Sequence, residues 1–270
     1  MRNIHIDRVL MNRVKRLLAS ARKDGSRNLM KSARWMINNS ILFFSTTLFA
    51  IGSIQAAINL DRTRIILDAD KPSVSITVTN DDRDRPFLAQ AWLEDADGRK
   101  SNDMLVVLPP VQRIEPGASS LVRLVATRAA QRLPKDKESL FYFNLRGIPP
   151  RDNNANALQI ALQTRIKLFY RPTSLRAKLG AVWQSKMILR RIADGYEINN
   201  PTPYYITVTG LKNRDGGYSN MTPLMMAPWS KSSLKAPRLD QPVISYINDY
   251  GGQPEIIFHC QKGTCYAKVQ

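Results

Sequence analysis

One stretch limits the possible folds more than any other, the alternating run from Leu158 to Leu168. Every second position except Thr164 is apolar, which is the period of a β-strand with one apolar face. The run is roughly twice the common strand length of 5–6 residues. Pro172 is expected to end the strand, because proline has no N–H group for the ladder. A strand this long either crosses the middle of a sheet or presents part of itself to another molecule.

Short apolar segments separated by turn residues fill the rest of residues 57–270. No helix longer than two turns is predicted among them. This spacing predicts antiparallel β-sandwiches. In the first set the predicted strands are Ile58–Leu67, Val74–Thr79, Phe87–Leu93, Leu105–Leu108, Leu121–Val125, Ser139–Leu145 and the long run itself. In the second set they are Ala181–Leu189, Tyr196–Ile198, Tyr204–Gly210, Thr222–Met226, Val243–Tyr246, Glu255–Phe258 and Cys265–Val269. We expect an all-β protein with two antiparallel sandwich domains, residues 57–176 and 177–270.

The N-terminal segment has the features of a secretory signal peptide. Its apolar run, Ile41–Ile51, is shorter than the ~20 residues that a membrane-spanning helix needs. Lys31 and Arg34 precede the run, and small residues follow it, so cleavage is expected between Ala56 and Ala57. Residues 1–56 are therefore expected to be removed, leaving an exported chain without membrane insertion.

Residues 1–29 precede this signal, and two interpretations remain open. They form either a true extension or an artefact of the start site, with translation beginning at Met30 or Met36. We favour the later start.

The formal charge is +18, but it is unevenly distributed. Residues 1–56 contribute +8 of it, so the remainder of the chain is moderately basic. Dense Lys/Arg runs with interleaved aromatic residues would indicate nucleic-acid binding, and the sequence has none. A nucleic-acid partner is therefore not expected.

The only two cysteines are Cys260 and Cys265. Behind a signal peptide they would meet an oxidising compartment, which favours a disulfide. Closing so short a loop contributes roughly 2 kcal/mol of stability. The alternative is a metal site with His259, but that supplies only three of the usual four ligands.

No catalytic motif is recognisable outside the leader. His259 is the single histidine of residues 57–270, and neither a G-x-S-x-G motif nor a Gly-rich phosphate loop occurs. The acidic segment Asp81–Asp84 lacks the spacing of a calcium loop. We therefore predict no catalytic residue, no metal and no cofactor.

Several long segments resemble the periplasmic pilus chaperones of the chaperone–usher pathway, the PapD-like family. The segments are Asn59–Arg64, Ala89–Trp92, Pro109–Arg113, Leu133–Pro150, Leu158–Pro172, Asn200–Tyr205 and Tyr246–Gly252. The resemblance covers the chain from about Ala57 to its end and is weakest between Leu211 and Val243. It implies two immunoglobulin-like domains at an angle, with a cleft between them.

The resemblance also implies a function and its partners. Such a chaperone binds, folds and caps pilus subunits in the periplasm by lending them a β-strand. It then delivers them to the outer-membrane usher. A self-capping homodimer is a possible resting form.

Three groups of residues receive roles from the resemblance alone. Arg64 and Lys167 correspond to the anchor for the C-terminal carboxylate of the subunit. The donor-strand residues that fill the subunit groove are Leu158, Ile160 and Leu162. The ionic cluster between the domains is Glu138, Arg171 and Asp249.

Other interpretations remain for the chain as a whole. Periodicity alone would place the three donor residues in the core. A structural pilus subunit or adhesin could share the sandwich fold, but it would carry a donor extension longer than Ala57–Asn59. A secreted enzyme is disfavoured by the missing motifs.

Overall fold

The computed structural model describes residues 57–151, 159–178, 180–217 and 221–267. The predictions for residues 1–56 and for Leu158 lie outside these ranges. The described chain forms strands and short 3-10 helices, so the all-β prediction is confirmed. The 3-10 helices are η1 (Arg128–Arg132), η2 (Thr173–Leu175) and η3 (Trp183–Lys186).

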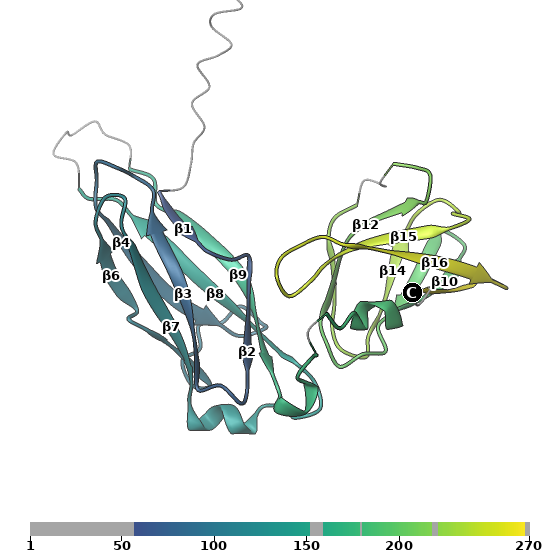
Figure 1. Ribbon diagram of the computed structural model, residues 1–270, viewed down its shortest axis with the longest axis horizontal. Helices are drawn as coiled ribbons and strands as arrows, with labels where there is room; N and C mark the ends of the chain where they lie inside the picture. Colours follow the sequence, from purple (N-terminus) through teal and green to yellow (C-terminus); the bar gives the residue numbers. More distant parts are fainter. Residues whose placement is uncertain (1–56, 152–158, 179, 218–220, 268–270) are drawn as a thin grey trace, which may run out of the picture. The chain divides into compact units, whose positions relative to one another are not determined.

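Two sheets form the first sandwich (Figure 1). The smaller sheet has the strand order β1-β3-β7-β5, and the larger has the order β2-β9-β8-β4-β6. The strands are β1 (Ile58–Leu60), β2 (Arg64–Asp68), β3 (Ser73–Asn80), β4 (Phe87–Glu94), β5 (Leu105–Leu108), β6 (Val111–Ile114), β7 (Ser119–Ala126), β8 (Ser139–Ile148) and β9 (Leu162–Arg171).

The first apolar segment divides between the two sheets. β1 pairs with β3, whereas β2 pairs with β9 in the other sheet. The prediction of one strand over Ile58–Leu67 is therefore wrong. Asp61 makes the last bond to β3, through its N–H and the carbonyl of Thr77 at 3.2 Å, and its carboxylate binds Arg62. Because this polar segment has no apolar side chain to bury, the chain crosses between the sheets there.

The crossing also gives the larger sheet one parallel pair. Arg64–Asp68 of β2 runs parallel to Lys167–Arg171 of β9. The other strand pairs described in this sandwich are antiparallel. The predicted antiparallel sandwich is therefore mixed at the β2–β9 edge.

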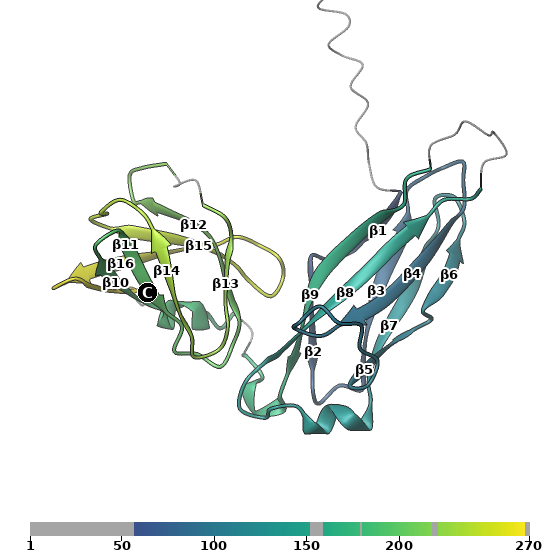
Figure 2. The same cartoon turned by 180° about the vertical axis from the view of Figure 1, so that it is seen from behind.

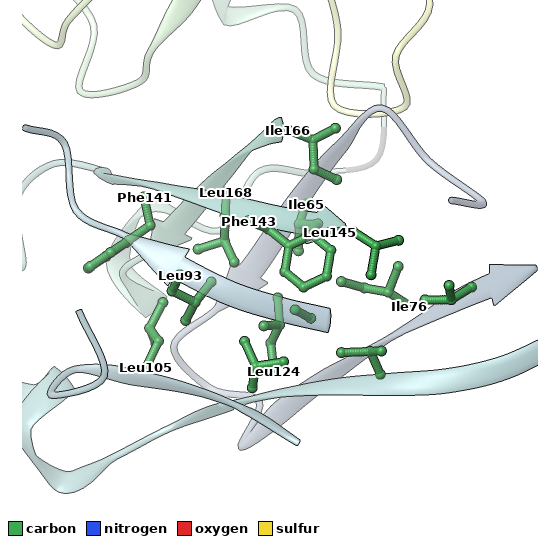
Figure 3. Close-up of a cluster of buried hydrophobic side chains, with 14 of the residues drawn as sticks. Ile65, Ile76, Leu93, Leu105, Leu124, Phe141, Phe143, Leu145, Ile166 and Leu168 are labelled. Carbon is green, nitrogen blue, oxygen red and sulfur yellow. The ribbon is translucent and has the colours of Figure 1, made fainter. Parts of the chain in front are cut away.

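The core of the first sandwich lies between its two sheets (Figure 3). Alternate residues of each strand point inward, as the period of two requires. Ile65 and Leu67 of β2 are fully buried, and so is Leu168 of the neighbouring β9. Each such side chain contributes about 1.5–3 kcal/mol on burial. The core therefore holds the β2–β9 edge in place.

The second sandwich has the strand order β13-β12-β15-β16-β17-β10-β11-β14 (Figures 1 and 2). β16 pairs with β15 along its first half and with β17 along its second half, so it joins two groups of strands around one core. The strands are β10 (Ile188–Ile192), β11 (Gly195–Asn199), β12 (Ile206–Asn213), β13 (Leu224–Met226), β14 (Lys231–Lys235), β15 (Pro242–Ile247), β16 (Glu255–Gln261) and β17 (Thr264–Ala267).

Three local predictions need correction. β6 and β14 are short strands at sheet edges that the sequence does not predict. β6 follows Pro109 and Pro110, and β14 consists mostly of polar residues. The strand predicted for Ala181–Leu189 is instead η3 followed by β10. There the carbonyl of Val182 accepts bonds from the N–H and the hydroxyl of Ser185, which closes a turn.

Candidate functional site

β9 is paired on both sides along only half of its length. β8 pairs with it over residues 162–170, whereas β2 pairs with it only over residues 167–171. Along Leu162–Ile166, no strand of the described chain pairs with the β2 side of β9. This half-edge therefore presents backbone N–H and C=O groups to a further strand.

Of the predicted donor residues, Leu162 opens this half-edge and Ile160 lies two residues before it. The strand was expected to begin at Leu158, but β9 begins at Leu162, opposite Gly147 of β8. β8 ends at Ile148 because Pro149 and Pro150 follow it and have no N–H groups. Ile160 is 62% exposed and Leu162 is 44% exposed, so neither belongs to the core.

The predicted anchor residues meet across the parallel pair. Arg64 opens β2 and lies opposite Lys167 of β9. Nη1 of Arg64 donates a long hydrogen bond of 3.4 Å to the carbonyl of Ile247, and Nζ of Lys167 lies 3.2 Å from the hydroxyl of Thr207. Both cations therefore reach from the first sandwich to β12 and β15 of the second.

Burial makes these two cations unusual. Arg64 is only 8% exposed, and Lys167 is half-buried. Burial lowers the pKa of Arg64, opposed by the charge of Asp249. Burial also lowers the pKa of Lys167, and the neighbouring charge of Arg64 lowers it further. A second cation and loss of water both disfavour the charged forms.

No carboxylate of the described chain forms an ion pair with either cation. The buried Nε of Arg64 also has no hydrogen-bond partner among the described residues. Buried charges are normally paired, because an unpaired buried charge is costly. Arg64 and Lys167 therefore form a site suited to an anion with two oxygen acceptors, such as a carboxylate.

The three predicted cluster residues are in direct contact. Nε of Arg171 donates to Oε1 of Glu138 at 2.8 Å, and its two Nη atoms bind Asp249 at 2.7 and 3.1 Å. Glu138 and Arg171 belong to the first sandwich, whereas Asp249 lies between β15 and β16 of the second. The cluster therefore ties the two sandwiches together.

Three further residues contact the cluster. The backbone N–H of Tyr205 donates to Oε2 of Glu138 at 2.8 Å. The guanidinium carbon of Arg171 lies 5.1 Å from the ring centre of Trp183 and 5.3 Å from that of Tyr204. Burial raises the pKa of Glu138 to about 7, although Arg171 opposes the shift. Asp249 and Glu138 raise the pKa of Arg171.

Sequence reasoning assigned no role to Tyr205, Trp183, Tyr204 or Thr207. Tyr204 and Tyr205 lie in Asn200–Tyr205, one of the segments that resemble the family. Their contacts with Arg171 and Glu138 could not be inferred from spacing, because the partners lie on distant strands.

A hollow of about 820 Å³ lies beside these groups. Its lining includes Arg64, Arg171, Trp183 and Asp249, so residues of both sandwiches contribute to it. Solvent and small anions therefore have a route to Arg64.

The disulfide between Cys260 and Cys265 is formed. It links β16 to β17, where the two cysteines are direct partners. The metal alternative therefore loses its thiol ligands. β16 and β17 lie in the interior of the strand order.

The described residues contain no group of three or more His, Cys, Asp and Glu side chains arranged to hold a metal ion. Among the described residues, no helix has the length and apolar character needed to cross a membrane.

Comparison with known proteins places this architecture in a family. The family described as "Pili and flagellar-assembly chaperone, PapD N-terminal domain" matches residues 57–176. The family described as "Pili assembly chaperone PapD, C-terminal domain" matches residues 182–258.

Individual relatives agree with these matches. The chain is 46% identical over 238 residues to the chaperone protein PapD of Escherichia coli. The match covers 87% of this chain and 100% of that one. It is 43% identical to the chaperone protein PmfD of Proteus mirabilis, over 80% of this chain and 88% of that one. The crystal structure of the Pseudomonas aeruginosa CupB2 chaperone matches with a TM-score of 0.61 and 29% identity, over 74% of this chain and 98% of that one. The protein therefore belongs to the PapD-like family of pilus-assembly chaperones.

Proposed function

We propose that this protein is a periplasmic chaperone that binds, folds and caps pilus subunits by donating a β-strand. It acts by binding and not by catalysis. The observation that carries the proposal is the unpaired half-edge of β9, which ends at two buried cations without a carboxylate partner in the described chain. An incoming strand and its terminal carboxylate would satisfy both features.

The position of β2 limits where an incoming strand can pair with β9, and the position of its carboxylate then sets its direction. β2 already covers β9 from Lys167 onward, so an added strand can pair only with the residues before it. Its end nearest β2 would meet Arg64 and Lys167. If that end carries the C-terminal carboxylate, the added strand runs parallel to β9.

Donor residues from the chaperone would fill the groove of the subunit. Ile160 and Leu162 stand at alternate positions, and Leu158 precedes them at the same spacing. Burying the two described side chains would contribute about 3–6 kcal/mol. Association costs about 4–15 kcal/mol, so the backbone pairing and the carboxylate anchor must also contribute.

Other parts of the molecule receive supporting roles in this proposal. The Glu138–Arg171–Asp249 cluster sets the relation between the domains, which we place at residues 57–176 and 177–270. After loading, the chaperone delivers the subunit to the outer-membrane usher. In its free form, a second copy of the chain could cover the exposed donor edge.

The proposal can be tested by co-expressing the chaperone with a pilin and recovering their complex from the periplasm. Lys167→Ala should abolish the complex, because the carboxylate loses one of its two cations. Lys235→Ala, which removes an exposed lysine of β14, is the matched control. Normal recovery of the complex with Lys167→Ala would contradict the anchor.

The donor strand requires its own variant. Leu162→Asp should also prevent complex formation, because it would place a charge in the apolar groove of the subunit. Leu121→Asp is the control, since Leu121 is 58% exposed on β7 of the other sheet. Equal loss of the complex in both variants would argue against a specific donor edge.

A further inference from the structure

The segment Asn248–Gly252, here called the 248–252 turn, connects β15 to β16 and is closed by its own hydrogen bonds. The N–H of Asn248 donates to the carbonyl of Gly252 at 3.0 Å. Oδ1 of Asn248 accepts from the N–H groups of Tyr250 and Gly252 at 3.0 and 2.9 Å. Because one side chain holds two backbone groups, the turn has a defined shape.

This turn connects the ionic cluster to the predicted anchor. Its Asp249 binds Arg171 through both carboxylate oxygens. The residue before the turn, Ile247, supplies the carbonyl that accepts the hydrogen bond of Arg64. The charge of Asp249 also acts on Arg64, whose pKa it raises against the effect of burial. The Asp249 carboxylate, which lies in the turn, and the Ile247 carbonyl, which adjoins it, therefore both act on the Arg64 guanidinium.

Gly251 brings the turn against the start of β2. Its φ angle is +85°, a conformation that favours glycine. A Cβ at this position would overlap Oγ1 of Thr63, the residue immediately before Arg64. The Cβ of Thr63 would lie 3.7 Å away, which is an ordinary contact. The close approach therefore depends on one missing Cβ and one hydroxyl group.

We infer that the 248–252 turn positions Arg64 for an incoming carboxylate, and that Gly251 is a positioning residue because it lets the turn pack against Thr63. Asp249 is already held by Arg171, so it stays with the cluster and leaves the Arg64 guanidinium available. The ionic cluster and the carboxylate anchor thus share one structural element. This inference rests on the proposed function, because it takes Arg64 as part of the anchor.

The test compares two peptides that carry the sequence of a pilin C-terminal strand, one with a free carboxylate and one amidated. The ratio of their dissociation constants isolates the carboxylate contribution. In the wild-type protein, amidation should weaken binding by about tenfold or more, as loss of charge-assisted hydrogen bonds does. If the ratio is one, both the proposed anchor and this inference are wrong.

Gly251→Ala should bring the ratio towards one, while affinity for the amidated peptide is retained. Adding Thr63→Ala should restore the ratio, because it removes the hydroxyl that the new Cβ would meet. Gly263→Ala is the matched control for backbone strain, since Gly263 has a φ angle of +84° and open space where a Cβ would stand. That control should keep the wild-type ratio.

Asn248→Ala provides a second route if Gly251→Ala does not fold. It opens the turn without adding an atom, and it should also reduce the ratio. If the wild type has a carboxylate effect but a folded Gly251→Ala or Asn248→Ala variant keeps it, the inference is overturned and the proposed function stands. Failure of Thr63→Ala to restore the ratio would overturn the role given to the Gly251–Thr63 contact.

Discussion

Removing Arg171 tests the physical account of the ionic cluster. Arg171→Met keeps the aliphatic stem but leaves the carboxylate of Glu138 without a cation. The side chains of Arg171 and Glu138 are only 5% and 2% exposed, so the carboxylate of Glu138 has little contact with water. Breaking one side of a buried pair costs about 3–5 kcal/mol of unfolding free energy.

The loss should depend on pH. Burial already raises the pKa of Glu138 to about 7, and loss of Arg171 would raise it further. In the variant, Glu138 can bind a proton and so avoid the cost of an unpaired buried charge. Binding that proton costs less free energy at pH 6 than at pH 8. We therefore expect about 3 kcal/mol of destabilisation at pH 8 and less at pH 6.

Urea unfolding followed by tryptophan fluorescence would measure these differences, because the ring of Trp183 lies beside Arg171. Adding Glu138→Gln removes the stranded charge, so the double variant should be more stable than Arg171→Met by about 1–2 kcal/mol at pH 8. Arg165→Met is the matched control on the same strand, since Arg165 is 41% exposed and its ion pair with Glu94 lies near the surface, where such pairs contribute about 0–1 kcal/mol. A loss below about 1 kcal/mol for Arg171→Met, or strict additivity with Glu138→Gln, would refute the reasoning.

Two further predictions concern stability. The folded-state pKa of Glu138 is raised from 4.5 to about 7, so the folded protein keeps a proton there that the unfolded chain releases. This contribution is present below pH 4.5 and is lost as the pH rises to 7, by at most about 3 kcal/mol. In urea titrations from pH 4.5 to 8, Glu138→Gln should flatten that decline, and an unchanged slope would contradict the shift. Replacing Cys260 and Cys265 together by alanine should lower the unfolding free energy by about 2 kcal/mol, because the short loop is no longer closed in the unfolded chain. Equal thermal stability of the variant and the wild type would contradict that value.

The local pattern of the sequence determined most of the strands. Alternation identified Leu158–Leu168 as a strand with one apolar face, and the turn residues marked most boundaries. It could not locate the start of β9, because a strand extends only as far as its partner. Pro149 and Pro150 end β8 at Ile148, so Ile160 remains unpaired.

Tertiary structure decided which distant residues meet. Arg64 and Lys167 were assigned by family resemblance, but only the parallel pairing of β2 with β9 places them opposite each other. That pairing follows from the crossing at Asp61–Thr63, a polar segment that the prediction of one strand over Ile58–Leu67 did not separate.

The apolar period of the sequence thus determined which faces are buried along most strands, but it failed at Ile160 and Leu162, which are exposed. Only the tertiary structure determined that Gly251 packs against Thr63, because that contact joins turns from two separate sandwiches. Arg64 and Lys167 acquire their lowered pKa values in the same way. The sequence gives the positive charges of Arg64 and Lys167. Their burial, and the absence of a carboxylate partner among the described residues, arise only when the strands assemble.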